Sequence, residues 1–333
     1  MQNRSSQQGD RPHWATYLRC PADGAKLTGP DDGGDTLEEW TGELKCRGCG
    51  AEYPVDRGIV CFVDTTARTM LDHPAKRNEM IARDRAATSY EARFSSIRNA
   101  VEVSPCIRAL ALDGSNAVAE LGCGTGRLTR RYLGHARYVV AVDFSMESLR
   151  QLREELQPAI RNRILLVHAD ITALPLAKGA FDRVASFQVL EHLPTAELRL
   201  AAVREARRLL APEGRLAASV YHWSASKQRE ARRGQGDNTK KQGFHATVPP
   251  IYYVNFTVDE ARALFESADL RVDTVAGIQL QLPLLSLLGP FVVPLNRAFA
   301  RTAFGLRHAH LLLVEASPRT RNPRQFRRHY FAR

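Results

Sequence analysis

The chain has 333 residues, of which 44% are hydrophobic, and its formal net charge is +11. This composition excludes a wholly disordered chain and allows one large core with a small appendage. The polar start, MQNRSSQQGDRPHW, does not resemble a signal peptide, and we expect disorder over residues 1–11. The six cysteines are unevenly placed, which is typical of a reducing compartment, so we expect a cytoplasmic protein.

The first predicted domain spans residues 12–65 and contains four of the cysteines. The segments LRCPADGAKL and LKCRGCGAEYPVDRGIVCFV resemble a small zinc-ribbon domain. The resemblance implies a Zn²⁺ site with ligands from two knuckles, namely Cys20, Asp23, Cys46 and Cys49. Asp23 stands where such ribbons have a cysteine, and a carboxylate can also ligate zinc. Two alternatives stay open: Cys61 supplies the fourth ligand, or the ribbon has lost its metal.

Residues 66–115 are predicted to be helical. The stretch NEMIARDRAATSYEARFSSIRNAVE alternates apolar and charged positions at helical spacing. Because this segment directly precedes the main domain, we expect it to cap the ligand pocket of that domain.

A glycine-rich turn opens the main domain. In AELGCGTGRL, residues 119–128, a short apolar strand precedes Gly122, Gly124 and Gly126, and a helical pattern follows. Strand, glycine turn and helix form the start of a nucleotide-binding unit, in which backbone N–H groups face the ligand. The spacing differs from the G-x-G-x-x-G of dinucleotide-binding proteins, which argues against a pyrophosphate. An ordinary tight turn is the alternative.

Three more strands follow the turn. RYVVAVDFS ends near Asp143, RILLVHADITALP contains Asp170 at its end, and FDRVASFQVLEHLP comes next. A carboxylate at the end of the second strand of such a fold accepts hydrogen bonds from both hydroxyls of a ribose. The pattern therefore predicts a nucleoside-binding α/β domain.

The ordered motifs E-L-G-C-G-T-G, V-D-F-S, H-A-D-I, F-D-x-V and V-L-E-H-L, followed by LLAPEGRLAASV, resemble the class I S-adenosylmethionine-dependent methyltransferases. They are similar in particular to the small-molecule, type-11-like branch that includes quinone-biosynthesis enzymes. The early ribbon resembles the activator subunit of several methyltransferases. The resemblance implies an α/β fold: a Rossmann-like seven-stranded sheet with helices on both faces over residues 116–316, plus the small zinc-ribbon-like β domain.

The same resemblance implies a set of residues around S-adenosylmethionine and its product S-adenosylhomocysteine. The turn would lie under the methionine part, Asp143 would hold the ribose diol, and Asp170 would accept a hydrogen bond from the adenine amino group. Tyr90 would close over the cofactor, although an aromatic residue on an amphipathic helix is also typical of a core. The full set is Tyr90, Glu120, Gly122, Gly124, Gly126, Asp143, Phe144, Met146, Asp170, Ile171 and Gln188.

Three further segments are predicted beyond the fifth strand. Residues 222–250 are polar and basic, and we expect a mobile loop that acts as a lid. Prolines interrupt the apolar insert at 280–306, so its sequence does not predict a transmembrane helix. It either packs on the core or forms an apolar tunnel or a peripheral membrane contact. The tail, 317–333, is basic and either solvated or in contact with phosphates.

Methyl transfer from an activated sulfonium needs little catalytic help from the protein. Positioning of the nucleophile can supply roughly 7–11 kcal/mol, and a general base contributes about 10²–10⁴-fold. His192, at the end of the fourth strand, is the best-placed base, followed by His222 and His245. A structural role for His192 in the E-H-L-P turn is the alternative.

The sequence predicts a methyltransferase that modifies an oxygen, nitrogen or carbon nucleophile of a small, apolar metabolite. RNA, either tRNA or rRNA, is the second candidate acceptor, because the tail interleaves arginines with Phe326, Tyr330 and Phe331. The third hypothesis is a non-catalytic, cofactor-binding partner protein.

Overall fold

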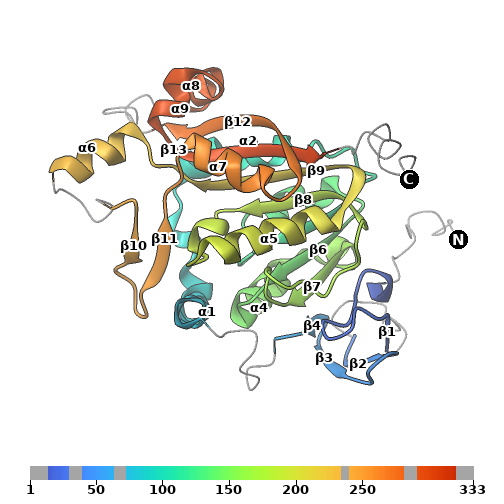
Figure 1. Ribbon diagram of the computed structural model, residues 1–333. Coiled ribbons are helices and arrows are strands. Elements are labelled where there is room, and N and C mark those ends of the chain that lie inside the picture. The colour runs from blue at the N-terminus through green and yellow to red at the C-terminus, as the bar shows by residue number, and fades with distance from the viewer. Residues whose placement is uncertain (1–13, 30–39, 64–72, 234–239, 281–290, 320–333) are drawn as a thin grey trace, which may run out of the picture.

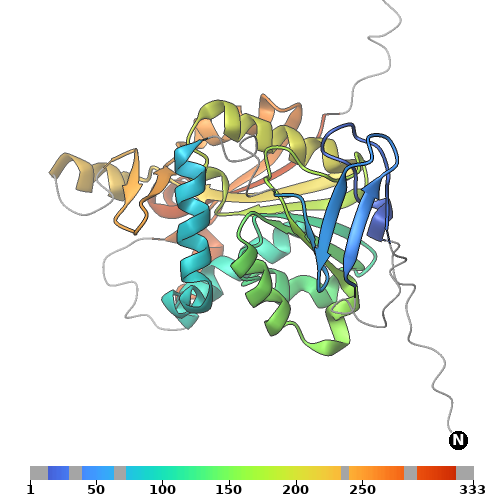
Figure 2. The ribbon, with the colours of Figure 1, turned by 90° about the horizontal axis from the view of Figure 1, so that it is seen from below.

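The computed structural model describes residues 14–29, 40–63, 73–233, 240–280 and 291–319. Its main feature is an eleven-stranded sheet in the order β1-β2-β3-β4-β7-β6-β5-β8-β9-β13-β12. Helices cover both faces, with α5 and α7 on one side and α2 and α4 on the other (Figures 1 and 2). The strands are β1 Leu27–Thr28, β2 Gly42–Cys46, β3 Glu52–Asp56, β4 Ile59–Cys61, β5 Ala117–Leu121, β6 Tyr138–Asp143, β7 Ile164–His168, β8 Phe181–Phe187, β9 Leu210–Tyr221, β12 Leu270–Leu280 and β13 Ala309–Pro318. Strands β10 Gln242–His245 and β11 Ile251–Val254 form a separate hairpin.

The described helices are α1 Pro74–Ala86, α2 Ser96–Leu110, α3 Thr129–Tyr132, α4 Met146–Glu155, α5 Ala196–Leu209, α6 Ala225–Arg233, α7 Val258–Glu266, α8 Val292–Phe299 and α9 Ala303–His308. Most of the longer helices begin at a capping side chain: Ser95, Ser145, Thr195 and Thr257 each accept a hydrogen bond from a backbone N–H of the first turn. Thr257 is the N-cap of α7, and Glu260 completes a capping box there.

The predicted seven-stranded sheet is confirmed. Its strands lie in the order β7-β6-β5-β8-β9-β13-β12. Strands β5 to β9 pair in parallel, whereas β13 runs antiparallel to both β9 and β12. Every residue of β5, β6 and β7 is buried. Burial on both faces explains why these strands read as unbroken apolar runs rather than alternating ones.

The ribbon strands continue this sheet instead of forming a sheet apart from it. Strand β4 pairs in parallel with β7, and Ile59 lies opposite Leu166. The backbone N–H groups of Phe62 and Val63 both donate to the carbonyl oxygen of His168, at 2.9 and 3.2 Å. Because β4 covers the edge of β7, the ribbon and the larger domain share one hydrophobic core.

The segment predicted as a helical cap contains α1 and α2, and residues 66–72 of it lie outside the described residues. Helix α1 contacts α4 and β11, so it crosses the edge of the sheet where the parallel strands end (Figure 2). Helix α2 ends at Ala111, whose φ of 46° is in the left-handed region.

The expectation of a loop over residues 222–250 is wrong for most of its described part. Helix α6 and strand β10 form within it, while residues 234–239 lie outside the described residues. The loop expectation rested on polarity, but SKQREARR is rich in helix formers, and β10 gains its hydrogen bonds from β11. Helix α6, β10 and β11 form an arm at the left of Figure 1.

The apolar insert packs on the domain in its described part. Val292 joins Val101 of α2 and Leu280 of β12 in one buried cluster, and residues 281–290 lie outside the described residues. Strand β13 extends to Pro318, so the basic tail begins after the predicted residue 317, and residues 320–333 are likewise not described. Among the described helices, none is long and apolar enough to cross a bilayer.

Candidate functional site

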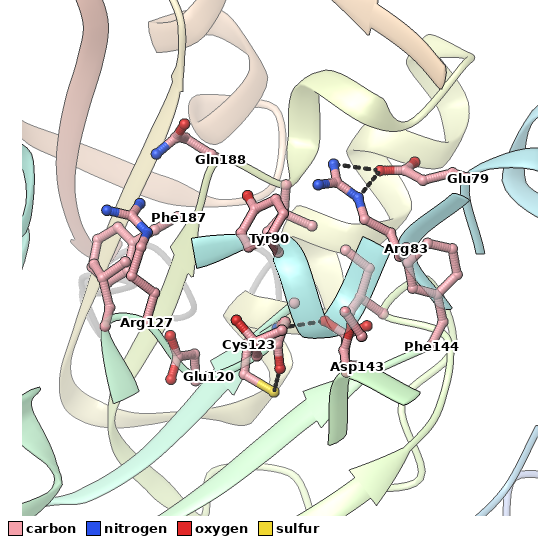
Figure 3. A pocket seen from close by; sticks show the side chains of 18 of the residues that line it. Glu79, Arg83, Tyr90, Glu120, Cys123, Arg127, Asp143, Phe144, Phe187 and Gln188 are labelled. Carbon is pink, nitrogen blue, oxygen red and sulfur yellow. Dashed lines mark hydrogen bonds and ion pairs between the residues drawn. The ribbon is translucent and has the colours of Figure 1, made fainter. Parts of the chain in front are cut away.

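A pocket lies at the edge of the sheet where the parallel strands β5, β6 and β8 end (Figure 3). It encloses about 1010 Å³, part of it open to solvent. Helix α1 forms one wall, and the glycine turn and the segments after β6, β7 and β8 form the rest. Nine of the eleven residues expected at the cofactor line it: Tyr90, Glu120, Gly122, Gly124, Asp143, Phe144, Asp170, Ile171 and Gln188. Such an edge is where open α/β sheets bind ligands.

The glycines of the turn have two different roles. A Cβ on Gly124, whose φ is +54°, would meet no atom within 4 Å, so the pocket side of this residue is open. A Cβ on Gly126, in contrast, would lie 2.2 Å from Leu152 Cδ1 of α4. Gly126 therefore allows the turn to pack against α4 and does not line the pocket. Gly124 is therefore the glycine whose backbone a ligand can approach closely.

Asp143 ends β6 beneath the turn and is 5% exposed. Its Oδ2 accepts a hydrogen bond from the Gly124 N–H at 2.7 Å, and its Oδ1 accepts one from the Ser145 N–H at 2.9 Å. Burial raises the pKa of this carboxyl, and the two backbone donors oppose that shift. Each oxygen keeps a lone pair toward the pocket, so the carboxylate can accept further hydrogen bonds there.

Phe144 lines the pocket beside Asp143, but Met146 does not. Met146 is the first residue of α4 and packs against the core, partly buried. The expected contact of Met146 with the cofactor stays a prediction.

Glu120 is a buried acid in the pocket wall. Its Oε2 accepts hydrogen bonds from Thr129 Oγ1 at 2.5 Å and from Tyr132 Oη at 2.6 Å. Burial raises the pKa of Glu120 to about 7, although both hydroxyl donors lower it. The carboxyl can therefore change charge near neutral pH when a ligand alters its surroundings.

Helix α1 contributes three charged residues that sequence reasoning missed: Lys76, Glu79 and Arg83. Lys76 forms a buried ion pair with Asp170, and Arg83 Nη2 donates to Glu79 Oε1 at 3.1 Å (Figure 3). Burial raises the pKa of Glu79 to about 7. Their spacing places them on one face of the helix, which was the available signal, but charged residues on a helix usually face solvent.

The other end of the pocket holds Tyr90, Arg127 and Gln188 (Figure 3). The guanidinium of Arg83 lies 5.6 Å from the centre of the Tyr90 ring. Arg127 and Gln188 both donate to Glu102 Oε1. The backbone of Gln188 has a φ of +57°, an unusual conformation for a residue with a side chain, and such conformations concentrate at functional sites.

None of the three candidate histidines lines the pocket. His192 Nδ1 lies 2.8 Å from the Tyr252 carbonyl oxygen, and His222 Nδ1 lies 3.1 Å from that of Ala309. Burial lowers the pKa of His192 well below its usual range and that of His222 to about 4. His245 stacks on Tyr253 with ring centres 4.5 Å apart, and burial lowers its pKa too. Burial thus favours the neutral form of all three imidazoles.

The ribbon brings its four expected ligands together. One ligand atom from each of Cys20, Asp23, Cys46 and Cys49 lies within 4.8 Å of the others. Cys20 Sγ is 3.7 Å from Cys49 Sγ, and Cys46 Sγ is 3.3 Å from Asp23 Oδ1. Two sulfurs bound tetrahedrally at zinc distances would lie about 3.8 Å apart, so the donor set fits this ion.

Asp23 has a fixed place in this cluster. A Cβ on Gly48 would lie 2.3 Å from Asp23 Oδ2, so a larger residue at this position would displace the carboxylate from its place in the cluster. Cys61, the alternative ligand, lies in β4 outside the cluster, and its thiol is 3.7 Å from the Ile59 carbonyl oxygen. The geometry therefore favours Asp23 over Cys61.

Residues 119–218 match the family model described as a methyltransferase domain. This match places a methyltransferase domain within the chain. The matched segment runs from the glycine turn through β9 and thus includes the three strands whose ends form the pocket.

Known proteins similar to this methyltransferase domain differ in what they act on. The mouse tRNA (carboxymethyluridine(34)-5-O)-methyltransferase ALKBH8 is 32% identical over 158 residues, which are 44% of this chain and 22% of that protein. This chain thus spans about a fifth of the length of that relative. The structure of the DhpI–SAM–HEP complex has a TM-score of 0.52 and 17% identity to this chain, and the match covers 74% of this chain and 99% of that one.

A Haloferax volcanii complex joins the Trm112 methyltransferase activator to a methyltransferase. The matched chain has a TM-score of 0.50 and 17% identity, covering 71% of this chain and 97% of its own length. At these identities the two structures establish the likeness of fold.

Replacing Glu120 with glutamine should change how stability depends on pH. The pKa of Glu120 is about 7 in the folded protein and near 4.5 when unfolded, so its stability contribution is intact below pH 4.5 and is lost as the pH rises through 7. The amide of Glu120→Gln keeps an oxygen for both hydroxyl donors and has no such loss. Urea unfolding at pH 5, 6.5 and 8 should show the variant gaining relative to the wild type, by at most about 3 kcal/mol. Parallel curves would contradict the burial argument, and the exposed Glu43→Gln variant is the control.

Proposed function

We propose that the chain transfers the methyl group of S-adenosylmethionine to an oxygen, nitrogen or carbon nucleophile of a small molecule. The observation that carries this proposal is the pairing of the open Gly124 backbone with the buried Asp143 at the end of β6. A backbone free of side chains can approach the methionine part, and a carboxylate with free lone pairs can accept both ribose hydroxyls.

Charged residues in the pocket wall support this assignment at both ends of the cofactor. Asp170 Oδ1 already accepts from the Thr172 N–H at 2.9 Å, and its Oδ2 pairs with Lys76. We therefore propose that Lys76 and Asp170 together frame the adenine. Glu120 lies beneath the turn, where its carboxylate would face the positive charges of the methionine part.

The protein's contribution to the chemistry is placement and exclusion of water. The bound sulfonium supplies an activated methyl group, so a nucleophile held in line needs little further help. Phe187, Val189 and Leu193 give the pocket an apolar wall next to Gln188. This wall desolvates the region where an acceptor would meet the cofactor.

RNA is the second candidate acceptor, and the observation that favours it is the 32% identity to the mouse tRNA methyltransferase. The basic tail adds arginines that can contact phosphates. A small molecule remains the main proposal because the pocket lies under α1, at the edge of the sheet, rather than on an open basic face.

We also propose that the ribbon binds one Zn²⁺ through Cys20, Asp23, Cys46 and Cys49. The backbone N–H groups of Gly48 and Cys49 point at Cys46 Sγ, at 3.2 and 3.4 Å, which stabilises a thiolate. Zinc here would be structural: it would hold two knuckles whose strands continue into the sheet through β4 and β7.

Asp143→Asn should remove most cofactor binding without unfolding the protein. The amide keeps the size of the side chain but loses the charge that strengthens hydrogen bonds to ribose, each worth about 1.5–3 kcal/mol. Calorimetric titration with S-adenosylhomocysteine should show an affinity at least tenfold lower, whereas Asp259→Asn on the exposed start of α7 should match the wild type. Unchanged affinity in Asp143→Asn would reject the ribose assignment.

The protein purified without chelators should contain close to one equivalent of zinc by elemental analysis. Asp23→Cys should tighten binding because thiolate matches zinc better, and Asp23→Ala should weaken it. Cys61→Ser should keep one equivalent, which separates the two candidate ligand sets. Because β4 pairs with β7, chelation should lower the melting temperature of the whole protein. Protein free of zinc, with Cys46 and Cys49 readily alkylated, would show a ribbon without metal.

Ending the chain after Arg319 removes residues 320–333 and five arginines while keeping β13 whole. For a small acceptor, kcat/KM should change less than twofold, because a distant charge adds no differential binding to the transition state. For RNA, affinity should fall, and each lost phosphate contact should remove close to one unit of the salt slope. A large, salt-sensitive loss would favour RNA over the small molecule.

A further inference from the structure

Two short helices at the top of Figure 1, α8 and α9, carry apolar and cationic residues on their outer side. These exposed residues recur three or four positions apart, within the helices or next to them, so they lie on one side of each helix. We call this surface the α8–α9 face; it consists of Phe291, Pro294, Arg297, Arg301, Phe304 and Arg307. The opposite side of the helices packs on the domain.

The helices that carry this face are held closely against strand β12. A Cβ on Gly277 of β12 would lie 2.5 Å from the Gly305 carbonyl oxygen, and a Cβ on Gly305 would lie 1.9 Å from that of Phe299. On α8, the Asn296 side chain accepts a hydrogen bond from the Leu280 N–H at 2.7 Å. Two glycines and a buried amide thus fix both helices on the sheet, so the exposure of the α8–α9 face is a property of the folded domain.

The face exposes large apolar side chains to water. Phe291 is 75% exposed and Phe304 is 41% exposed. The Phe304 ring also packs on Phe299, with ring centres 5.3 Å apart, and this contact joins the two helices. Removing the exposed part of these rings from water would be favourable, because the hydrophobic free energy grows with the apolar area that is buried.

The charge of the α8–α9 face has one sign. Residues 291–308 contain three arginines and no acidic residue. Arg301 Nη2 lies 3.3 Å from Glu315 Oε1, whereas no ion pair to Arg297 or Arg307 is present in the part of the chain that the structure describes. Two guanidinium groups therefore remain available for an anionic partner.

Neighbouring helices add further positive charge. Helix α6 contacts α9, and α2 contacts α8. Burial, followed by the charges of Arg229 on α6 and of Arg307, lowers the pKa of His308. Burial and then the charge of Arg297 lower the pKa of Arg108 on α2. The surroundings of the face are thus positive, which attracts an anionic surface over a distance.

We propose that the α8–α9 face binds the surface of a membrane that contains anionic lipids. The phenyl rings enter the boundary between headgroups and acyl chains, and the guanidinium groups reach the lipid phosphates. Helices α8 and α9 have eight and six residues, so they lie along the surface and do not cross the bilayer. This binding does not depend on the proposed methyl transfer or on its acceptor.

A bilayer matches this face better than a second copy of the chain or a nucleic acid does. In a symmetric dimer formed through this face, the arginines of one copy would meet those of the other, and like charges repel. RNA would pair with the arginines, but it offers no apolar layer for Pro294 and Phe291. The interface of an anionic bilayer accommodates the guanidinium groups and the apolar side chains at once.

Co-sedimentation of the full chain with vesicles tests this proposal. Vesicles of equal parts phosphatidylglycerol and phosphatidylcholine should bind the protein at least tenfold more tightly than vesicles of phosphatidylcholine alone, because each arginine near the surface adds attraction. Arg297→Gln combined with Arg307→Gln should weaken binding about tenfold. Phe291→Ser combined with Phe304→Ser should weaken it at least fivefold, because less apolar area is buried.

Matched variants control for charge and for apolar area. Arg131→Gln combined with Arg204→Gln removes the same charge from exposed positions on α3 and α5, and Phe244→Ser removes a 57% exposed phenylalanine from the arm. Both should stay within twofold of the wild type. The basic tail also attracts anionic lipid, so every variant is measured again in the chain that ends after Arg319.

Equal binding to the two kinds of vesicle, or controls that lose as much as the face variants, would overturn the proposal. So would a dimer in analytical ultracentrifugation that Phe291→Ser dissociates, or binding to a uridine oligonucleotide, but not to vesicles, that the arginine variant abolishes. Melting temperatures are measured first. Because Arg297 and Arg307 are exposed, their variant decides the matter even where the loss of Phe304 destabilises α9.

Discussion

The parallel pairing of β5 with β6 and β8 determines where the functional side chains of this protein can lie. Parallel strands end at the same edge, so the glycine turn after β5, Asp143 at the end of β6 and Gln188 after β8 meet around one space. The buried, apolar strands hold this edge rigid. The Gly124 N–H then donates to Asp143 Oδ2 at 2.7 Å.

Burial of charge is the second consequence of this arrangement. Once α1 covers the edge of the sheet, Glu79, Glu120 and Asp143 are removed from water, and burial raises the pKa of all three. Lys76 and Arg83 on the same helix neutralise part of this charge through Asp170 and Glu79. The wall of the pocket therefore holds carboxyl groups whose protonation responds to a cationic ligand, which suits a site for a sulfonium compound.

The ribbon is not a separate unit, because its last strand is joined to the sheet of the larger domain. Strand β4 covers β7, and His168 at the end of β7 receives two backbone hydrogen bonds from the residues after β4. Nε2 of the same histidine lies 3.0 Å from the carbonyl oxygen of Phe144. Phe144 in turn lines the pocket. A short path of hydrogen bonds thus runs from the residues after the ribbon strand β4 to Phe144 in the wall of the pocket. A metal that orders the knuckles would stabilise this side of the domain.

The sequence by itself determined the local elements and the residues that belong to contiguous motifs. Apolar runs predicted the strands, and the order of the motifs predicted the sheet and nine of the residues that line the pocket, including Gly124, Asp143 and Gln188. Such predictions succeed because a strand, a turn and a helix cap depend on neighbours in the chain. They failed for the loop expected around α6, where the helix formers of the segment and a distant partner strand decide the outcome.

Only the tertiary structure decided which charged residues are buried and what they meet. Nothing local distinguishes Lys76 or Glu79 from solvent-facing residues, since their burial comes from packing α1 across the sheet edge. Likewise, the sequence suggested His192 as a base, whereas packing against the Tyr252 carbonyl fixes its tautomer and leaves Glu191 without a partner. Burial and pairing between residues far apart in the chain are set by how the elements pack, because the energy of a charge depends on its surroundings in space and not on its neighbours in sequence.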